Sequence, residues 1–397
     1  MGFVVTTEQE ITREIETAAK SELDTVVRSI FDDPSASVVP GWIVGPLGSV
    51  SKGIGTLALL KVEGFAQTGG TKQGWSAVLK IMTLCAEGGV GQVGSVNGEV
   101  EAYRHGLFED PSTGFRSARA YSITSKSADV VWLWTEDLSG YDGVPWSTEK
   151  YLQSAVTLGR KKGRLMGQSI QDYPWMNHGA GMDRWANPGI DKLFDVLATK
   201  RDSDYVRRAL PKKMYDRVLR FGADHSKLTA AVSDVPRTVA HGDCHIRNLF
   251  TSPGDADQFE LVAIDLASVG IEAIGSDLGT LMGSSLTWGD EEADTVMRVE
   301  EDFFEAFMNG FISEGAGTSR DLIRLSYLTS VCGYGKVVAL VPAIVEDRSG
   351  PWEWVLTRYG GEDLEEDLPD SYRVRIEFIT TLFDEALGLV DQVTGSK

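Results

Sequence analysis

The chain has 397 residues, 42% of them hydrophobic and 24% charged, and its formal net charge is −20 at pH 7. This composition is sufficient for a folded core, and the length fits two lobes around a cleft better than one ordinary domain. Such an acidic surface repels the phosphates of nucleic acids and anionic lipids. We therefore expect no nucleic-acid partner and no membrane association.

The first part of the chain predicts one helix followed by a small antiparallel sheet. Apolar residues recur at helical spacing from residue 11 to residue 31, and Asp33 and Pro34 end this run. A further helix is predicted at residues 97–107. Short apolar segments separated by glycine-rich turns predict strands at residues 38–44, 56–62, 75–82 and 130–135.

From about residue 140 onward the pattern becomes mostly helical, interrupted by two short predicted strands at residues 238–240 and 259–264. Apolar periodicity predicts helices at residues 147–170, 192–200, 213–221, 300–311, 321–341 and 372–387. The sequence thus predicts an α+β protein, with a sheet-rich lobe at residues 1–137 and a helical lobe at residues 138–397. The basic run at residues 160–164 is expected on a solvated helix face.

The residues best suited to catalysis lie between the two short strands of the helical lobe. Four polar side chains follow an apolar strand within one short loop: His241, Asp243, His245 and Asn248. Burying so many polar groups is costly unless they are paired or used in chemistry. A further acid, Asp265, ends the next apolar segment, where a cleft would open.

This set of residues matches the requirements of phosphoryl transfer. The transition state is loose, so the protein mainly positions the reactants and neutralises charge. One carboxylate must orient the attacking hydroxyl, and oxygen ligands must hold Mg²⁺ on the nucleotide phosphates. We therefore assign Asp243 as the base or hydroxyl-orienting acid, and Asn248 and Asp265 as Mg²⁺ ligands.

The motif His-Gly-Asp-Cys-His-x-x-Asn at residues 241–248, followed by Asp265 and then Asp277, resembles the aminoglycoside phosphotransferase/choline kinase family. The resemblance is clear over roughly residues 75–280. It implies a two-lobed fold similar to that of protein kinases, ATP and Mg²⁺ as cofactors, and a small-molecule hydroxyl as acceptor. The family usually has Trp after the second Asp, whereas Leu266 stands here; this change affects packing and removes no ligand.

The resemblance also assigns a nucleotide site. Lys80 looks like the strand lysine that holds the nucleotide phosphates, and Glu99 looks like its partner on a helix. Glu101 competes with Glu99 for this role, and Lys80 could instead be an ordinary strand-end lysine. The hinge whose backbone meets the adenine is matched by Glu136, Asp137 and Leu138. The glycine-rich residues 45–55 resemble the phosphate-covering loop only weakly.

Several neighbouring residues have structural interpretations. His241 and His245 are expected to hydrogen-bond loop backbone, with proton transfer by His241 as the alternative, and their loop spacing argues against zinc. Cys244 is expected to pack in the core, and Asp277 to brace the loop. The Gly-x-Gly-x-x-Gly pattern at residues 89–94 imitates a dinucleotide-binding motif, but no strand leads directly into it.

Cysteine usage and the N-terminus bear on location. The three cysteines, Cys85, Cys244 and Cys332, are widely spaced and contain no CxxC pair, which favours a reducing compartment. The N-terminus lacks a signal-peptide pattern, and no apolar stretch approaches the ~20 residues that span a membrane. We expect a cytoplasmic monomer or homodimer.

Two other classes of function remain open from the sequence. A protein kinase of the same fold would need an activation segment, and the stretch between Asp265 and Asp277 is short for one. A non-catalytic nucleotide-binding scaffold would have no need to retain Lys80, Asp243 and both metal ligands together. The acceptor could be a sugar, amino sugar, aminoglycoside or amino alcohol, and the acidic charge slightly favours polyhydroxylated or amino-sugar molecules.

Overall fold

The computed structural model describes residues 20–47, 55–84, 96–166, 168–178, 188–253, 259–288, 290–347, 356 and 368–395. Most of the glycine-rich loop at residues 45–55, the glycine pattern at residues 89–94, and Cys85 lie outside these ranges.

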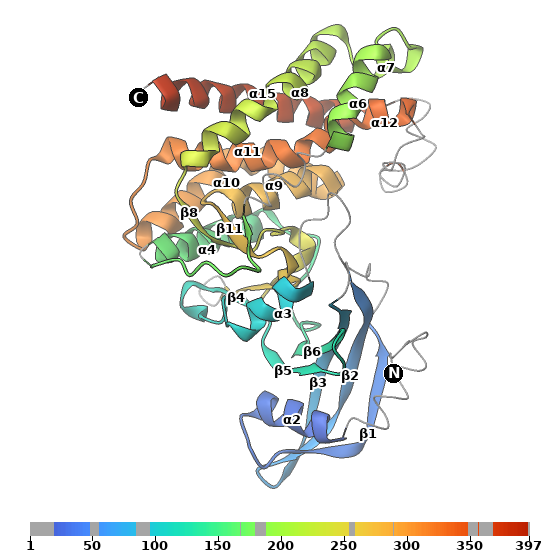
Figure 1. The fold of residues 1–397 in the computed structure, drawn as a ribbon, viewed down its shortest axis with the longest axis vertical. Helices are drawn as coiled ribbons and strands as arrows, with labels where there is room; N and C mark the ends of the chain where they lie inside the picture. The colour runs from blue at the N-terminus through green and yellow to red at the C-terminus, as the bar shows by residue number, and fades with distance from the viewer. Residues whose placement is uncertain are drawn as a thin grey trace.

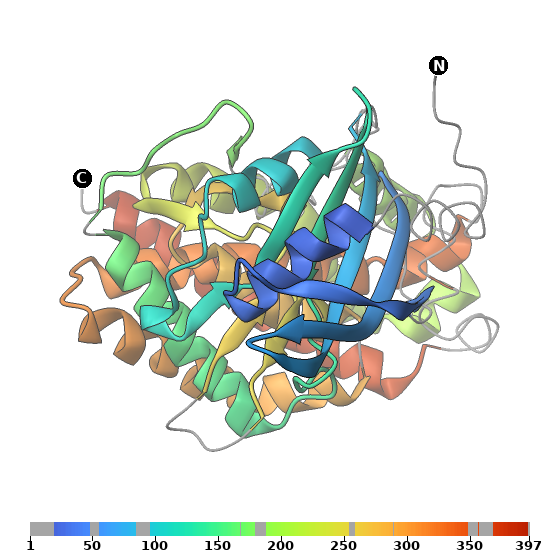
Figure 2. The ribbon, with the colours of Figure 1, turned by 90° about the horizontal axis from the view of Figure 1, so that it is seen from below.

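The N-terminal part of the chain forms a five-stranded antiparallel sheet in the order β1-β2-β3-β6-β5. Its strands are β1 (Ser37–Pro46), β2 (Thr56–Thr68), β3 (Thr71–Thr83), β5 (Ala120–Ser125) and β6 (Val130–Glu136). Helix α2 (Lys20–Phe31) lies across one face of this sheet and buries Leu23, Val26 and Val27 against it (Figure 2). The four predicted strands are confirmed, and β5 is additional.

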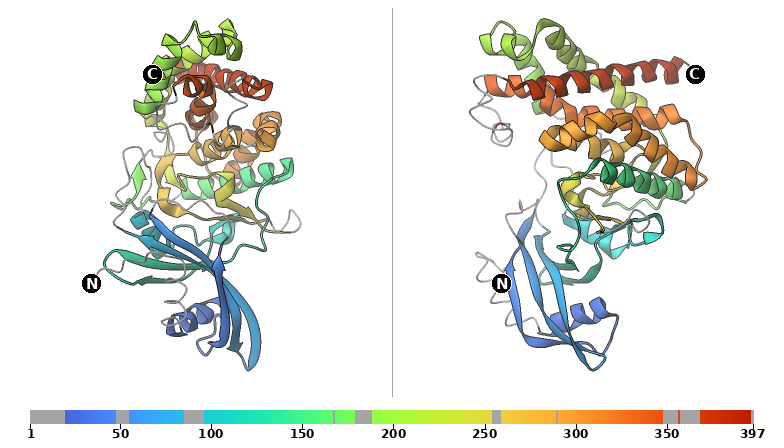
Figure 3. Two further views of the ribbon diagram at one scale, coloured as in Figure 1. Left: turned by 90° about the vertical axis from the view of Figure 1, so that its right-hand side faces the viewer. Right: turned by 180° about the vertical axis from the view of Figure 1, so that it is seen from behind.

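The C-terminal part is mainly helical and encloses the larger of the hydrophobic cores (Figure 1). Its helices are α4 (Thr148–Met166), α6 (Pro188–Thr199), α7 (Asp204–Ala209), α8 (Lys212–Ala231), α9 (Ser276–Trp288), α10 (Asp290–Ser313), α11 (Arg320–Ala339), α12 (Val341–Glu346) and α15 (Asp370–Gly395). The side views in Figure 3 show the sheet and the helices stacked along the long axis. The α+β, two-lobed prediction is confirmed.

Helix α9 had no counterpart among the predicted helices. Its residues from Ser276 to Thr287 are buried, so its sequence of serines, glycines and apolar residues lacks the one-sided pattern of a surface helix. A related case is the segment Arg320–Glu346, which has the length and hydropathy of a membrane span, but 94% of its apolar 18-residue window is buried inside the protein. Such burial is typical of a core helix.

Two three-stranded sheets lie between these parts. One has the order β4-β10-β9 and the other the order β7-β11-β8. Their strands are β4 (Phe115–Ser117), β7 (Asn177–His178), β8 (Arg237–Ala240), β9 (Leu249–Thr251), β10 (Leu261–Ala263) and β11 (Gly270–Ala273). Strand β4, which lies within residues 1–137, pairs in parallel with β10. The chain therefore contacts the helical part before it returns to the first sheet through β5.

Helices α4 and α10 pack with their backbones in close contact. A Cβ atom on Gly159 would lie 2.1 Å from the Phe307 carbonyl oxygen, and one on Gly163 would lie 2.5 Å from that of Phe311. The neighbouring Lys161 and Lys162 are only 6% and 1% exposed. The prediction of a solvated face was therefore wrong for these two lysines: Lys162 pairs with Asp277 at 2.8 Å, and the Lys161 ammonium lies over the ring of Phe108.

Candidate active site

The motif loop leaves β8 at His241, whose ring is fully buried. The Asp243 backbone N–H donates to its Nδ1 over 3.2 Å, so the proton lies on Nε2, which donates to the Ile264 carbonyl over 2.9 Å. Because both ring nitrogens are engaged, His241 joins the loop to the end of β10. This is the structural role expected from the sequence.

Asp277, in the first turn of α9, braces the same loop. Its carboxylate accepts hydrogen bonds from the backbone N–H groups of His241 and Gly242, both at 3.1 Å. The Lys162 ammonium lies 2.8 Å away and also donates to the Val239 carbonyl. Burial opposes ionisation of Asp277, but Lys162 and these hydrogen bonds hold its pKa below the ordinary value. The motif loop is thus held in place by a buried ion pair.

Gly242 is required at its position for two reasons. Its φ angle is +74°, in the left-handed region. A Cβ atom there would lie 2.1 Å from the Ser268 carbonyl oxygen. The loop can therefore approach the segment after Asp265 only with glycine at this site.

Asp243 and Asn248 are linked within the loop. The Asn248 side-chain NH₂ donates to the Asp243 carbonyl over 3.1 Å, which leaves the amide oxygen as the atom available to a ligand. The Asp243 carboxylate is 22% exposed, and Nε2 of His245 lies 3.8 Å from its Oδ2. The other ring nitrogen of His245 accepts the Arg247 backbone N–H. His245 therefore also binds loop backbone.

Asp265 follows β10 with φ 58° and ψ 64°, a left-handed conformation that is uncommon for a residue other than glycine. Backbone strain of this kind persists mainly where the surrounding structure imposes it, as at functional sites. The carboxylate is 35% exposed, and its Oδ1 lies 3.2 Å from the ammonium of Lys80. Asp265 thus adds a contact from the helical part to Lys80 of the first sheet.

Lys80 extends from β3 to the helix α3 (Val96–Arg104), where its Nζ lies 2.6 Å and 2.9 Å from the two carboxylate oxygens of Glu99. Glu101 pairs instead with Arg104 at 2.6 Å. Burial alone lowers the pKa of Lys80, but the carboxylates of Glu99 and Asp265 outweigh burial and raise it. Lys80 is therefore a charged ammonium held between two carboxylates.

The hinge residues lie at the end of β6, with both carboxylates engaged. Glu136 binds the guanidinium of Arg116, with the nearest contact at 2.6 Å. Asp137 pairs with Lys61 of β2 at 3.1 Å. Arg116 also reaches Glu260, next to β10, at 2.9 Å. The hinge residues are thus tied to the helical part through Arg116.

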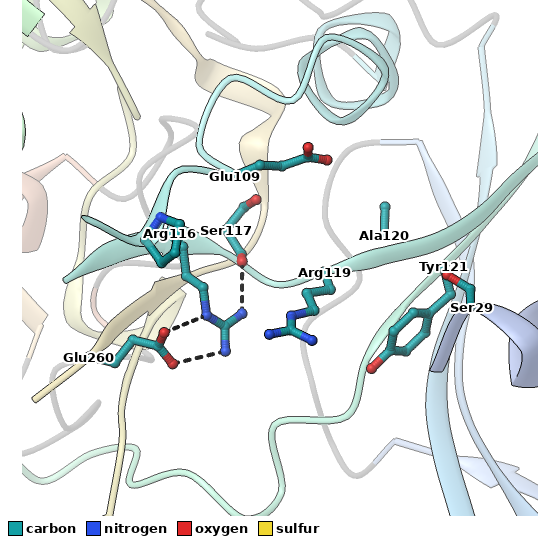
Figure 4. A pocket seen from close by; sticks show the side chains of 9 residues that line it. Ser29, Glu109, Arg116, Ser117, Arg119, Ala120, Tyr121 and Glu260 are labelled. Carbon is teal, nitrogen blue, oxygen red and sulfur yellow. Dashed lines mark hydrogen bonds and ion pairs between the residues drawn. The ribbon is translucent and has the colours of Figure 1, made fainter. Parts of the chain in front are cut away.

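A cavity of about 400 Å³ lies beside Arg116 (Figure 4). Its lining residues are Ser29, Glu109, Pro111, Arg116, Ser117, Arg119, Ala120, Tyr121 and Glu260. None of the residues predicted for catalysis or for nucleotide or metal binding is among them. No sequence pattern pointed to Arg116, because a single arginine in a three-residue strand creates no periodicity.

The oxygen donors of Asn248 and Asp265 suit Mg²⁺, which typically takes one or two protein ligands and completes its shell with phosphates and water. Among the described residues there is no cluster of three or more His, Cys, Asp or Glu side chains that could hold a metal ion.

Cys244 and Cys332 are fully buried. Burial raises the pKa of both thiols well above the ordinary value, so neither is a reactive thiolate. This agrees with the predicted packing role of Cys244.

No protein-family model matches the chain, and no curated protein matches it by sequence. Among solved structures, it is similar to a choline/ethanolamine kinase family protein from Mesorhizobium loti, with TM-score 0.45 and 15% identity over 94% of this chain and 99% of that one. Amicoumacin kinase in complex with AMP-PNP and Ca²⁺ gives TM-score 0.48 and 12% identity over 94% and 96%.

An aminoglycoside phosphotransferase from Streptomyces rimosus, in complex with ADP and streptomycin, gives TM-score 0.36 and 17% identity over 79% of this chain and 97% of that one. The solved structures to which the chain is similar thus include choline kinase-type and aminoglycoside phosphotransferase-type proteins.

Proposed function

We propose that the protein is an ATP- and Mg²⁺-dependent phosphotransferase that transfers the γ-phosphoryl group to a hydroxyl of a small molecule. The main support is one constellation of charges. Lys80 is held between Glu99 and Asp265. Asp265 follows β10, and β10 pairs with β9, the strand that begins directly after the loop of Asp243 and Asn248. Ile264, the neighbour of Asp265, donates its backbone N–H to the Asn248 carbonyl at 2.9 Å, so the candidate phosphate-binding cation and the candidate base lie on directly bonded segments.

In this proposal each side chain has one task. The acceptor hydroxyl donates its hydrogen bond to Asp243, which takes the proton as the acceptor oxygen attacks the γ-phosphorus. The bond from the γ-phosphorus to the β–γ bridging oxygen breaks, ADP leaves, and Asp243 later returns the proton to solvent. Lys80 binds phosphate oxygens, and Glu99 holds Lys80. Mg²⁺, held by Asn248 and Asp265, would neutralise charge on the phosphates.

The segment after Asp265 favours a small molecule over a protein as acceptor. It forms the 3₁₀ helix η5 (Leu266–Ser268) and then β11, whose four residues are all buried, before α9 begins at Ser276. A protein kinase needs an activation segment at this point, and a buried strand leaves no length for one. A peptide substrate would therefore have no activation segment to bind against.

A screen identifies the acceptor. ADP release from Mg-ATP is measured against sugars, amino sugars, aminoglycosides and amino alcohols, and mass spectrometry checks each active compound for an added phosphate. A phosphorylated small molecule supports the proposal. Phosphorylation of a protein substrate, with no active compound in the panel, would contradict the proposed acceptor class.

Asp265→Ala is expected to weaken Mg-ATP binding far more than the binding of ATP in EDTA, because Asp265 is proposed to bind the metal and not the base. Calorimetric titration of ATP with and without Mg²⁺ measures both affinities. The matched control is Asp142→Asn, which removes an exposed carboxylate beside Lys150 and should change neither affinity. Equal losses in both conditions would make Asp265 a structural residue.

Lys80 and Glu99 are expected to behave as one unit. Lys80→Met and Glu99→Gln should each lower kcat/KM for ATP, and the double variant should cost much less than the sum of the two free-energy changes. Glu101→Gln is the control, since helix residues two apart point in nearly opposite directions and Glu101 binds Arg104. Additivity of Lys80→Met with Glu99→Gln would remove this pair from the nucleotide site.

A further inference from the structure

Tyr334 of α11 contacts the proposed base directly. Its hydroxyl donates to Asp243 Oδ1 over 3.3 Å, although the two residues are 91 positions apart in sequence. The tyrosine is 2% exposed, so its ring is fixed by the core and its hydroxyl reaches the edge of the site. The bond is longer than the usual O–H···O distance of about 2.8 Å, as catalytic hydrogen bonds often are before a substrate complex forms.

The position of Tyr334 depends on a row of three glycines: Gly275, which directly precedes α9, and Gly279 and Gly283 within it. A Cβ atom on Gly275 would lie 2.5 Å from the Tyr327 nitrogen, one on Gly279 would lie 2.4 Å from the Tyr327 oxygen, and one on Gly283 would lie 2.8 Å from Cβ of Tyr334. These three glycines recur every four residues and line one face of the helix. They let α11 approach closely enough for Tyr334 to reach the catalytic loop.

Helix α9 therefore controls two features of the loop at once. Asp277 in its first turn fixes the loop backbone through His241 and Gly242. Its glycine face sets the position of Tyr334, and Thr287 adds a hydrogen bond from its hydroxyl to the Tyr334 carbonyl at 3.3 Å. The same helix, α9, thus positions both the backbone of the loop that carries Asp243 and the Tyr334 hydroxyl that binds the Asp243 carboxylate.

We propose that Tyr334 is a positioning residue for phosphoryl transfer, an inference that rests on the proposed role of Asp243. The torsion that turns an aspartate carboxylate, χ2, is broad, so the rotamer alone does not fix the plane of the two oxygens. A hydrogen bond to Oδ1 fixes that plane and directs Oδ2 to the acceptor hydroxyl. Misplacing a reacting group by about 1 Å can cost ~10²-fold in rate.

The test is Tyr334→Phe, which removes one hydroxyl and keeps the ring that packs in the core. ADP release from Mg-ATP is measured with water as acceptor and with the acceptor from the screen. We expect kcat to fall by about 10- to 100-fold with KM for ATP unchanged. The matched control is Tyr327→Phe, the same substitution on the same helix at a fully buried tyrosine, which should leave kcat within about twofold.

A double-mutant cycle with Asp243→Asn separates positioning from a general effect on the fold. If Tyr334 acts through Asp243, Tyr334→Phe adds almost nothing in the Asp243→Asn background. An unchanged kcat for Tyr334→Phe, or a loss equal to that of Tyr327→Phe, would overturn the inference even when Asp243→Asn lowers kcat by about 10²- to 10⁴-fold. Unimpaired turnover by Asp243→Asn would instead contradict the proposed function.

Discussion

Asp243→Asn is expected to lower kcat for phosphoryl transfer by about 10²- to 10⁴-fold, the usual contribution of a general base. The substitution keeps the size of the side chain and removes its ability to take a proton. The loop should remain folded, because its hydrogen bonds to Asn248 and His241 involve the Asp243 backbone and not its carboxylate. Calorimetry should show Mg-ATP binding within a few-fold of the wild type.

The matched control for this prediction is Asp216→Asn, the same change at a half-exposed aspartate of α8 that pairs with Lys212. It should leave kcat and ATP binding unaltered. If Asp243→Asn turns over its acceptor at a rate close to that of the control, Asp243 is not the base.

Lys162→Met is expected to lower the free energy of unfolding by about 3–5 kcal/mol, the usual cost of removing one partner of a buried ion pair. The reason is that Asp277, 3% exposed, would be left as an unpaired carboxylate inside the core. Denaturant titration followed by fluorescence measures the change. Replacing both partners, with Lys162→Met and Asp277→Asn together, should recover part of the loss.

The control is Lys161→Met on the adjacent position. Lys161 is also buried, and burial lowers its pKa, so replacing this ammonium by an apolar side chain should cost little or be stabilising. A loss for Lys161→Met as large as that for Lys162→Met would mean that packing, not the ion pair, explains both effects.

The same pair makes a pH prediction. The folded-state pKa of Asp277 lies below the ordinary value of 3.8, so the pair's contribution is present above that value and is lost as the pH falls through the folded pKa. Lys162→Met should therefore lose less stability on acidification than the wild type.

The residues that the sequence singled out as candidates share a local signature. Asp243, Asn248 and Asp265 each follow an apolar strand, and a polar group at the end of a buried strand is conspicuous in the sequence itself. Apolar residues that recur at helical or strand spacing likewise predicted the sheet and most of the helices, because an element that buries one face carries its apolar residues on that face. Helix α9 lacks such a face and was not predicted.

The residues that the sequence missed act through contacts between distant segments. In the sequence, Lys162 resembles a surface lysine in a basic run. In the structure, α10 packs against α4 and Lys162 pairs with Asp277. Tyr334 resembled one more apolar position of a core helix, and Arg116 an isolated charge. Their partners are 115, 91 and 20 residues away, respectively.

The sequence by itself predicted the two-lobed α+β fold and a set of candidate site residues, because strand ends, motif spacing and apolar periodicity are local properties. The tertiary structure alone decided that Glu99, and not Glu101, meets Lys80, and that α9 sets both the backbone and the carboxylate environment of the catalytic loop. The first outcome depends on how the helix of Glu99 is rotated about its axis. The second depends on glycine contacts between helices, because a position without a Cβ atom lets two helix backbones come close, and no local sequence pattern reveals which helices do so.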